Sequence, residues 1–338
     1  MNEPSGCIHT IREARPSDND ALIKLELRCP LDLGNVELVM DRRPDFFAQT
    51  QVQEHSLVLV AEEEGKLVGV VAGAWHDVPL LGDTRHLLYV HHERILPSHQ
   101  GKGLGRALVM ELVARTREAG IHSLYWLIVP SNERSMRFAQ SAGIQRWPVA
   151  GRLCQMDLAA AAHSPRVRTL ERERAGEAAS LINVAHGGLE LFSPFTGHRL
   201  RERLARTDAY TWGDYYGLFD GERLVAVGGL WDQGRSLAFI RRHRRDGSTS
   251  FSRAMPVVDY GFTPGAEAAM VEMLQHLAAL AVDRGRNELA LGLPPPGPLD
   301  VLLQGLPHTV DEFCCFIPVI PVPEEGAIKG IHLDPFYL

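Results

Sequence analysis

The chain has 338 residues, 45% of them apolar and 23% charged, which fits a globular protein with enough chain for two domains. A formal net charge of -7 gives no broad cationic field, so we expect no nucleic-acid partner. The start shows no signal-peptide pattern and no apolar run reaches about 18 residues, which predicts a cytoplasmic protein with no membrane partner.

The cysteines argue against a disulfide framework or a zinc ribbon. They are odd in number and none has Cys-x-x-Cys spacing: Cys7, Cys29, Cys154, Cys314 and Cys315. The simplest interpretation is buried thiols. The histidines include no His-Glu-x-x-His spacing, so we expect no metal site.

Residues 8–158 predict the order strand, helices, hairpin, long strand, helix, strand, helix, strand. The better-marked elements are a hairpin over 58–61 and 67–74, a strand over 85–96, a helix over 103–119, a strand over 123–129 and a helix over 133–142. Gly120 and Gly143 mark the two helix ends. A small, polar stretch over 159–168 then reads as a linker.

The same order returns after the linker. Its elements are a strand near 167–170, helical runs over 176–206, a hairpin over 215–219 and 224–230, a helix over 266–283, a strand over 288–293 and a terminal strand over 331–336. Two copies of one α/β (α+β) topology fit this pattern, each with a mixed, mostly antiparallel sheet flanked by helices. We therefore predict domains over 1–160 and 165–338.

One glycine-rich loop carries the most specific signal. Gln100, Gly101, Lys102, Gly103, Leu104, Gly105 and Arg106 stand between a strand and an amphipathic helix. Alternate glycines let backbone N–H groups approach an anion at a helix start, which predicts a pyrophosphate cradle. Walker A and dinucleotide spacings fit less well. The alternative is a glycine-rich helix start without a ligand.

This loop resembles the acyl-CoA loop of the GNAT superfamily of N-acetyltransferases, Gln/Arg-x-x-Gly-x-Gly/Ala. The resemblance implies acetyl-CoA or another acyl-CoA as cosubstrate, with its pyrophosphate on the backbone of residues 100–106. It also implies that the preceding strand end, at Arg94, Ile95 and Leu96, pairs with the pantetheine arm. Lys102 and Arg106 would add positive charge to the phosphate site.

A second stretch, from Asn132 to Ile144, resembles the GNAT segment that contacts the cofactor arm. Asn132 and Ser135 are the expected contacts, although Asn132 serves equally well as a helix N-cap. GNAT enzymes often place a tyrosine four residues before the closing glycine to protonate the thiolate, and here that residue is Ala139. The proton would then come from Tyr125, Cys154, Ser135 or water.

A general base is expected on the strand before the loop. Tyr89, His91 and Glu93 alternate with the strand period and should share a face, with His92 on the opposite face unless a bulge intervenes. Glu93 or His91 is the candidate base, acting directly or through water. Each is equally compatible with a solvated or core-facing position.

The second copy of the loop is degenerate. Gly265 matches Gly103, but Pro264 removes a backbone donor and Glu267 places negative charge where phosphate would lie. We expect weak or no pyrophosphate binding there. The basic run 241–247 is read as a solvated hairpin loop, with contact to an anionic substrate or to the adenine-ribose phosphate as the alternative.

The tandem arrangement resembles two-copy GNAT proteins of actinomycete secondary metabolism, such as the mycothiol synthases. The resemblance implies an acyltransferase that moves an acetyl or other short acyl group to an amine of a small molecule, working as a monomer or homodimer. The alternative is an acyl-CoA-binding accessory or sensor protein with little catalysis, which the residue at Ala139 favours.

Overall fold

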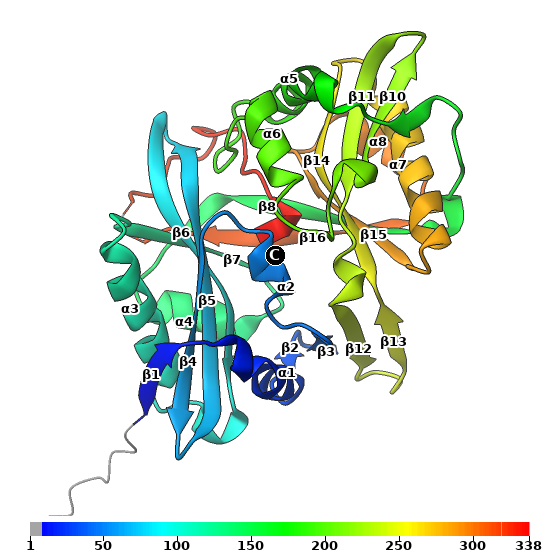
Figure 1. Ribbon diagram of the computed structural model, residues 1–338. Coiled ribbons are helices and arrows are strands. Elements are labelled where there is room, and N and C mark those ends of the chain that lie inside the picture. The colour runs from blue at the N-terminus through cyan, green and yellow to red at the C-terminus, as the bar shows by residue number, and fades with distance from the viewer. Residues whose placement is uncertain (1–8, 319, 338) are drawn as a thin grey trace, which may run out of the picture.

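The computed structural model describes residues 9–318 and 320–337 (Figure 1). The first half contains β1 (Thr10–Glu13), α1 (Asn19–Leu27), β2 (Leu31–Asp32), β3 (Val36–Asp41), α2 (Ala48–Gln51), β4 (Ser56–Glu63), β5 (Lys66–Leu80), β6 (Asp83–Ile95), α3 (Leu104–Arg117), β7 (Ser123–Ile128), α4 (Glu133–Ser141) and β8 (Arg146–Asp157). The predicted hairpin, long strand and two helices of this half are confirmed to within a few residues at their ends.

The second half repeats this order. It contains β9 (Val167–Thr169), α5 (Ala175–His186), α6 (Gly197–Arg203), β10 (Tyr215–Asp220), β11 (Arg223–Leu230), β12 (Ala238–His243), β13 (Thr249–Ser252), β14 (Ala254–Phe262), α7 (Glu267–Asp283), β15 (Glu288–Leu293), α8 (Pro298–Leu303) and β16 (His308–Phe316). The fold is mixed α/β, with mostly antiparallel strands flanked by helices.

A continuous sheet joins the two halves. Its twelve strands have the order β1-β4-β5-β6-β7-β16-β8-β15-β14-β11-β10-β9. The pairs β6 with β7 and β14 with β15 are parallel, and the other pairs in this sheet are antiparallel. Each half therefore has one parallel pair at the corresponding place in its element order.

The halves exchange their last strands at the middle of this sheet. β8, from the first half, lies between β15 and β16, and β16, from the second half, lies between β7 and β8. Figure 1 shows both strands running across the centre of the molecule. Each half of the chain therefore contributes a strand that lies among the strands of the other half.

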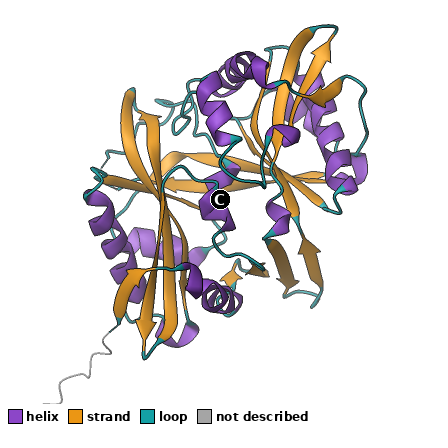
Figure 2. Cartoon of the chain, viewed as in Figure 1, coloured by secondary structure: helices purple, strands orange, loops and turns teal. Residues whose placement is uncertain are grey.

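A second, smaller sheet is built from insertions of both halves. Its order is β13-β12-β3-β2, with β3 and β12 paired antiparallel along their full lengths. In Figure 2 it lies at the lower edge of the opening between the halves. The two halves thus contact each other through two sheets.

Helices cover the strands of each half. In the first half α3 packs on β4, β5 and β6, and α1 packs on β3 and β5 from the other side (Figure 1). The α3 side chains Leu104, Leu108 and Leu112 are buried, as the predicted apolar face requires. No helix in the described part of the chain is long and apolar enough to cross a membrane.

One expected element was wrong. Residues 331–336 form no strand; Ile331 makes one isolated bridge to Glu190, and a 3-10 turn covers Pro335–Tyr337. The basic run 241–247 spans the end of β12 and the exposed turn before β13, as the expected hairpin requires, and Arg241 lines a cavity. Cys29, Cys154, Cys314 and Cys315 are buried free thiols, and Cys7 lies outside the described residues.

Candidate active site

Each glycine of the glycine-rich loop is required for its own geometric reason. Gly101 and Gly103 have φ angles of 75° and 81°, in the left-handed region that favours glycine. Gly105 has no positive φ, but a Cβ atom there would lie 2.3 Å from Oε1 of Glu93. The loop can therefore turn twice and still pass directly over the Glu93 side chain.

The loop presents a run of unused backbone donors. Within the described residues, none of the N–H groups from Gly101 to Arg106 has an acceptor, and the helical bonding of α3 begins with Ala107 donating to Gly103. Lys102 and Arg106 are exposed beside these amides. Gln100 instead donates from its side chain to the Ile95 carbonyl, at 2.8 Å, which fixes the start of the loop. This arrangement fits a diphosphate bound at a helix start.

The strand before the loop separates from its parallel neighbour. β6 and β7 pair from Leu87 with Ser123 to Tyr89 with Tyr125, and the described residues show no further pairing between them. Ile95 pairs with Gly69 on the other side of β6, and Leu96 donates to Val68. The β7-facing edge of β6 beyond Tyr89 is therefore open toward an extended ligand arm.

A bulge in β6 overturns the expected arrangement of the candidate bases. His91 pairs with Ala72 but Arg94 pairs with Val70, so one extra residue is inserted, and His92 has a φ of 54°. Tyr89 and His91 stack at 5.1 Å between ring centroids, and the Nδ1 atoms of His91 and His92 contact each other. The carboxylate of Glu93 lies against Gly105 on the α3 side. The expectation that Glu93 and His91 share a face was therefore wrong.

The two candidate bases have different electrostatic environments. Burial raises the pKa of Glu93, with Arg94 and Arg134 acting in the opposite direction. Burial, with smaller contributions from Arg42 and Arg94, lowers the pKa of His91 to about 3. His91 is thus neutral at physiological pH and a weak base, whereas the pKa of Glu93 is raised above its ordinary value.

The start of α4 faces the same space. Asn132 accepts a hydrogen bond from the Ser135 amide at 3.2 Å, which confirms the N-cap. Asn132, Ser135 and Ala139 all line the cavity described below. Tyr125 and Cys154 are buried and do not line it, and burial raises the pKa of Cys154 to about 12. Ser135 is therefore the better placed of the expected side-chain proton donors.

A cavity of about 330 Å³ connects these elements. β6, β7 and α4 bound it on one side, and the small sheet and strands of the second half bound it on the other. Its polar lining residues are Arg42, His91, His92, Glu93, Arg94, Asn132, Ser135, Gln155, Gln233, Arg241, Glu288 and Asp311. Both halves are therefore needed to enclose the space next to the splayed strands.

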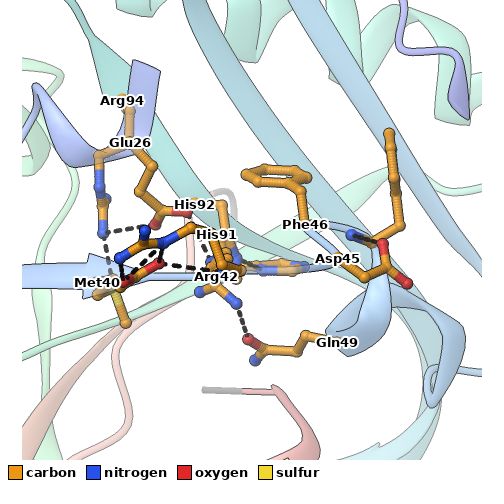
Figure 3. Close-up of polar contacts among 12 residues, drawn as sticks. Glu26, Met40, Arg42, Asp45, Phe46, Gln49, His91, His92 and Arg94 are labelled. Atoms are coloured by element: carbon orange, nitrogen blue, oxygen red, sulfur yellow. Dashed lines mark hydrogen bonds and ion pairs between the residues drawn. The ribbon is translucent and has the colours of Figure 1, made fainter. Parts of the chain in front are cut away.

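A buried charged cluster on this cavity was missed from the sequence (Figure 3). Glu26 of α1 lies 2.7 Å from Arg42, measured between Oε2 and Nε, and 3.8 Å from Arg94, between Oε1 and Nη2. Arg42 also donates to Oε1 of Gln49 at 2.8 Å. These residues come from separated segments and follow no motif, so no sequence signal could have grouped them.

The corresponding loop of the second half is internally satisfied. Gly265 has a φ of 83°, like Gly103, but its amide donates to Oε1 of Glu267 at 3.3 Å. Beyond the paired part of β14 and β15, a Cβ on Gly292 would lie 1.9 Å from the Leu333 carbonyl. The C-terminal segment thus fills the space that is open in the first half.

The described residues include no group of three or more His, Cys, Asp or Glu side chains placed to hold a metal ion. His91 and His92 contact each other, but they face two arginines and a single carboxylate. The donor set of the cavity therefore suits organic polar and anionic groups.

Comparison with known sequences agrees with this geometry in the first half. Residues 19–144 match the family model "Acetyltransferase (GNAT) family". The L-amino acid N-acyltransferase MnaT of Escherichia coli (strain K12) is 39% identical over 88 residues, which are 25% of this chain and 48% of that protein. An L-methionine sulfoximine/L-methionine sulfone acetyltransferase of Salmonella typhimurium has the same identity and coverage. The chain spans about half the length of these curated relatives.

Comparison of structures extends to both halves. N-myristoyltransferase of Saccharomyces cerevisiae with bound myristoyl-CoA is similar with a TM-score of 0.66 and 11% identity, covering 98% of this chain and 91% of that one. At this identity the likeness concerns the fold. The glycine loop and the splayed strands lie within residues 19–144, the segment that is similar to the acetyltransferase (GNAT) family.

Proposed function

We propose that this protein is a CoA-dependent N-acyltransferase that moves an acetyl or other short acyl group from acyl-CoA to an amine of a small molecule. The observation that carries the proposal is the run of unused amides from Gly101 to Arg106, which leads directly into the open edge of β6. The printed names of the curated relatives, which describe acyl and acetyl transfer to amino acids, support it.

The residues of the loop would hold the cofactor by its diphosphate. The amides of residues 101–106 donate to phosphate oxygens, and Lys102 and Arg106 add positive charge. The open edge of β6 near Arg94, Ile95 and Leu96 would pair with the pantetheine arm, with Asn132 and Ser135 on its other side. When bound, acyl-CoA would supply the thioester.

Acyl transfer then needs a neutral amine and a proton for the departing thiolate. We assign the first task to Glu93, acting through water, because its raised pKa makes it a stronger base than His91. Both ring nitrogens of His91 have partners, Nε2 with Gln53 and Nδ1 with His92, so we assign no proton transfer to this residue. Ser135, one helical turn before Ala139, or water would protonate the thiolate.

The alternative is an acyl-CoA-binding protein with little turnover. The observation that favours it is Ala139, which leaves no phenol at the position where this family often has a tyrosine. Incubating the full-length chain with acetyl-CoA and a panel of small amines while recording free thiol separates the two. Amine-dependent thiol release supports the enzyme, and saturable acetyl-CoA binding without release supports the binding protein.

The two copies of the loop give a matched pair of variants. Gly103→Ala should reduce acetyl-CoA affinity at least tenfold, because its φ of 81° is strained for alanine and the cradle would relax. Gly265→Ala has the same strain, with φ at 83°, and should cost similar stability, about 1 kcal/mol, with unchanged affinity. Calorimetric titration and thermal unfolding of both variants measure these effects. Equal affinity losses in the two variants would contradict the proposed cradle.

Finer aspects of the proposal rest on the sequence. We place the reaction in secondary metabolism, including antibiotic biosynthesis, because of the resemblance to two-copy proteins. The division into a cofactor-binding repeat, 1–160, and a degenerate repeat, 165–338, is proposed with shared strands β8 and β16. A cytoplasmic location, the absence of a nucleic-acid partner and a monomeric or homodimeric state stay predictions.

A further inference from the structure

The charged cluster on the cavity wall contains two arginines around one buried carboxylate. Arg42 and Arg94 stand against Glu26, whose side chain is 1% exposed, and Arg42 is itself only 2% exposed. Glu26 and Arg94 are the charged groups that act on the pKa of Arg42. Glu26 is thus the carboxylate that acts on Arg42, while Arg94 acts on both Arg42 and Glu93.

The neighbouring histidines add no charge to this cluster. Burial and the two arginines lower the pKa of His91 to about 3 and that of His92 well below its ordinary value. Both rings are therefore neutral at physiological pH and add neither positive nor negative charge. Glu93 lies against Gly105 and lines the same cavity. Burial raises its pKa and the charge of Arg94 opposes this rise, so Glu93 is a second carboxylate near Arg94 and not near Arg42.

The hydrogen-bonding capacity of the cluster is also incompletely used. Arg42 donates from Nη1 to Gln49, but its buried Nη2 has no hydrogen-bond partner among the described residues. The contact of Arg42 Nε with Glu26 is close, at 2.7 Å, yet it lacks hydrogen-bond geometry, and both Glu26 oxygens are unsatisfied. An unsatisfied buried guanidinium is costly, so the cluster is suited to gain an anionic partner.

The position of the cluster relates this partner to the reaction. Arg94 directly follows Glu93 on β6, and Arg42, His91 and Arg94 line the same cavity as Glu93. The carboxylate of an α-amino acid is two bonds from its nitrogen. An amine at the splayed strands would therefore hold its carboxylate within reach of this cluster. Leu38, Met40 and Phe239 of the small sheet give the cavity an apolar wall for a side chain.

We propose that the amine acceptor carries a carboxylate bound by Arg42 and Arg94, which makes apolar α-amino acids the substrate class of this site. The inference rests on the proposed function and narrows it. Arg42 is then a specificity-determining residue for the acceptor, as well as the ion-pair partner of Glu26.

The first test compares acceptors that differ only in charge. L-leucine, L-methionine and L-phenylalanine are each paired with the matching carboxamide, and acetyl-CoA-dependent thiol release is recorded with the full-length chain. The amine of an amino amide is less basic, so reactivity alone favours the amide. We expect kcat/KM for the acids to be higher by about tenfold or more, as charge-assisted hydrogen bonds suggest. Equal values, or higher values for the amides, overturn the inference.

A binding measurement separates this inference from the proposed function. The same six compounds are titrated calorimetrically into the chain saturated with CoA, where no transfer occurs. Absence of thiol release with every amine would count against the enzyme, while tighter binding of the acids would still support the carboxylate site. Equal binding of acids and amides, or no binding of any compound at millimolar concentration, overturns it.

Variants test the role of Arg42 without leaving a buried charge alone. Glu26→Gln with Arg42→Gln removes both charges and should abolish the preference for acids over amides. Glu26→Gln alone is the control and should keep the preference or increase it, because Arg42 loses its competing carboxylate. A double variant that keeps the full preference would show that Arg42 acts only as a structural ion pair. If the double variant does not fold, Arg94→Gln, at a site 12% exposed, should reduce the same preference, and an unchanged preference there overturns the inference.

Discussion

Glu93 occupies an unusual place for a carboxylate, because it lies beneath the first turn of the helix whose amides would hold a diphosphate. Burial raises the pKa of this group, so the folded protein binds a proton more tightly than the unfolded chain. The ionised form is consequently a cost to folding, which grows as the pH rises from the unfolded pKa to the folded pKa. A residue that destabilises the fold in its ionised form is a candidate for function.

The variant Glu93→Gln should therefore be more stable and less active than the unaltered chain. We expect its melting temperature to exceed that of the unaltered chain by an amount that grows as the pH rises from the ordinary pKa of 4.5 to the raised pKa of the folded state, because glutamine cannot ionise. Amine-dependent thiol release should fall about a hundredfold or more if Glu93 is the base. Thermal unfolding across this pH range and steady-state kinetics measure both effects.

The companion variant His91→Gln keeps a polar side chain at the other candidate position. Because the pKa of His91 is about 3, its loss should not move the pH dependence of kcat between pH 6 and pH 9. An acidic limb that disappears in His91→Gln and persists in Glu93→Gln would contradict the assignment of Glu93 as the base.

At the residue level, sequence reasoning worked where chemistry depends on short-range order. The glycines at 101, 103 and 105 and the cap at Asn132 were predictable because each acts within a few residues of its position. The side of the strand on which Glu93 lies was not predictable. A single inserted residue at His92 reverses the alternation of side chains along the strand, and the composition gives no signal of it. The pairing of Glu26 with Arg42 depends on tertiary packing alone.

Among the elements, β8 and β16 determine how far the repeats are independent. Both neighbours of β8 belong to the second half. One edge pairs with β15 through six residue pairs, from Glu288 with Asp157 to Leu293 with Arg152, and the other edge pairs with β16. The outer edge of β7 is in turn covered by β16. Removing the second half would expose the edge of β7 and leave β8 without partners.

The isolated segment 1–160 should therefore not reproduce the cofactor site. We expect it to aggregate or to bind acetyl-CoA at least tenfold more weakly than the full-length chain, and co-expression with 161–338 should restore binding. Size-exclusion chromatography and calorimetric titration measure this. A monodisperse 1–160 segment with full affinity would mean that β8 can pair with β7 directly and that the exchange is dispensable.

The order of elements could be read from the sequence because hydrophobic period, turns and caps are local signals. Strand exchange could not, since β8 and β16 look alike as β-prone runs and their neighbours are chosen by contacts across more than 130 residues of chain. The segment 331–336 illustrates the opposite error. Its alternating apolar and polar residues indicate a strand, but Leu333 instead packs against Gly292 in the second half's closed cleft.

Across the whole molecule, several histidines have a pKa that the surrounding protein lowers. His76, His91 and His186 are buried, His92 and His332 are half-buried, and desolvation is the first cause of the lowered pKa in each. The pKa is lowered to about 4 for His76 and His332 and to about 3 for His91 and His186. They come from both halves and lie around the cavity and the C-terminal segment.

This distribution predicts a steep loss of stability in mild acid. Below the ordinary histidine pKa near 6.5 the unfolded chain binds protons that the folded chain excludes, so unfolding takes up protons and the free energy of unfolding falls with pH. Each histidine contributes a slope of about 1.4 kcal/mol per pH unit until the pH reaches its folded pKa. Above pH 7 the same groups are neutral in both states and contribute no slope.

Denaturant unfolding from pH 8 to pH 5 measures the prediction directly, with a nearly flat region above pH 7 and a fall below pH 6.5. His76→Leu is a suitable variant, because Nδ1 of His76 has no hydrogen-bond partner in the described structure and the ring packs against Tyr337. It should reduce the acid slope by about 1.4 kcal/mol per pH unit while leaving the slope above pH 7 unchanged. An unchanged acid slope in this variant would mean that His76 is protonated in the folded chain, and that the interface between the halves is wetter than its packing indicates.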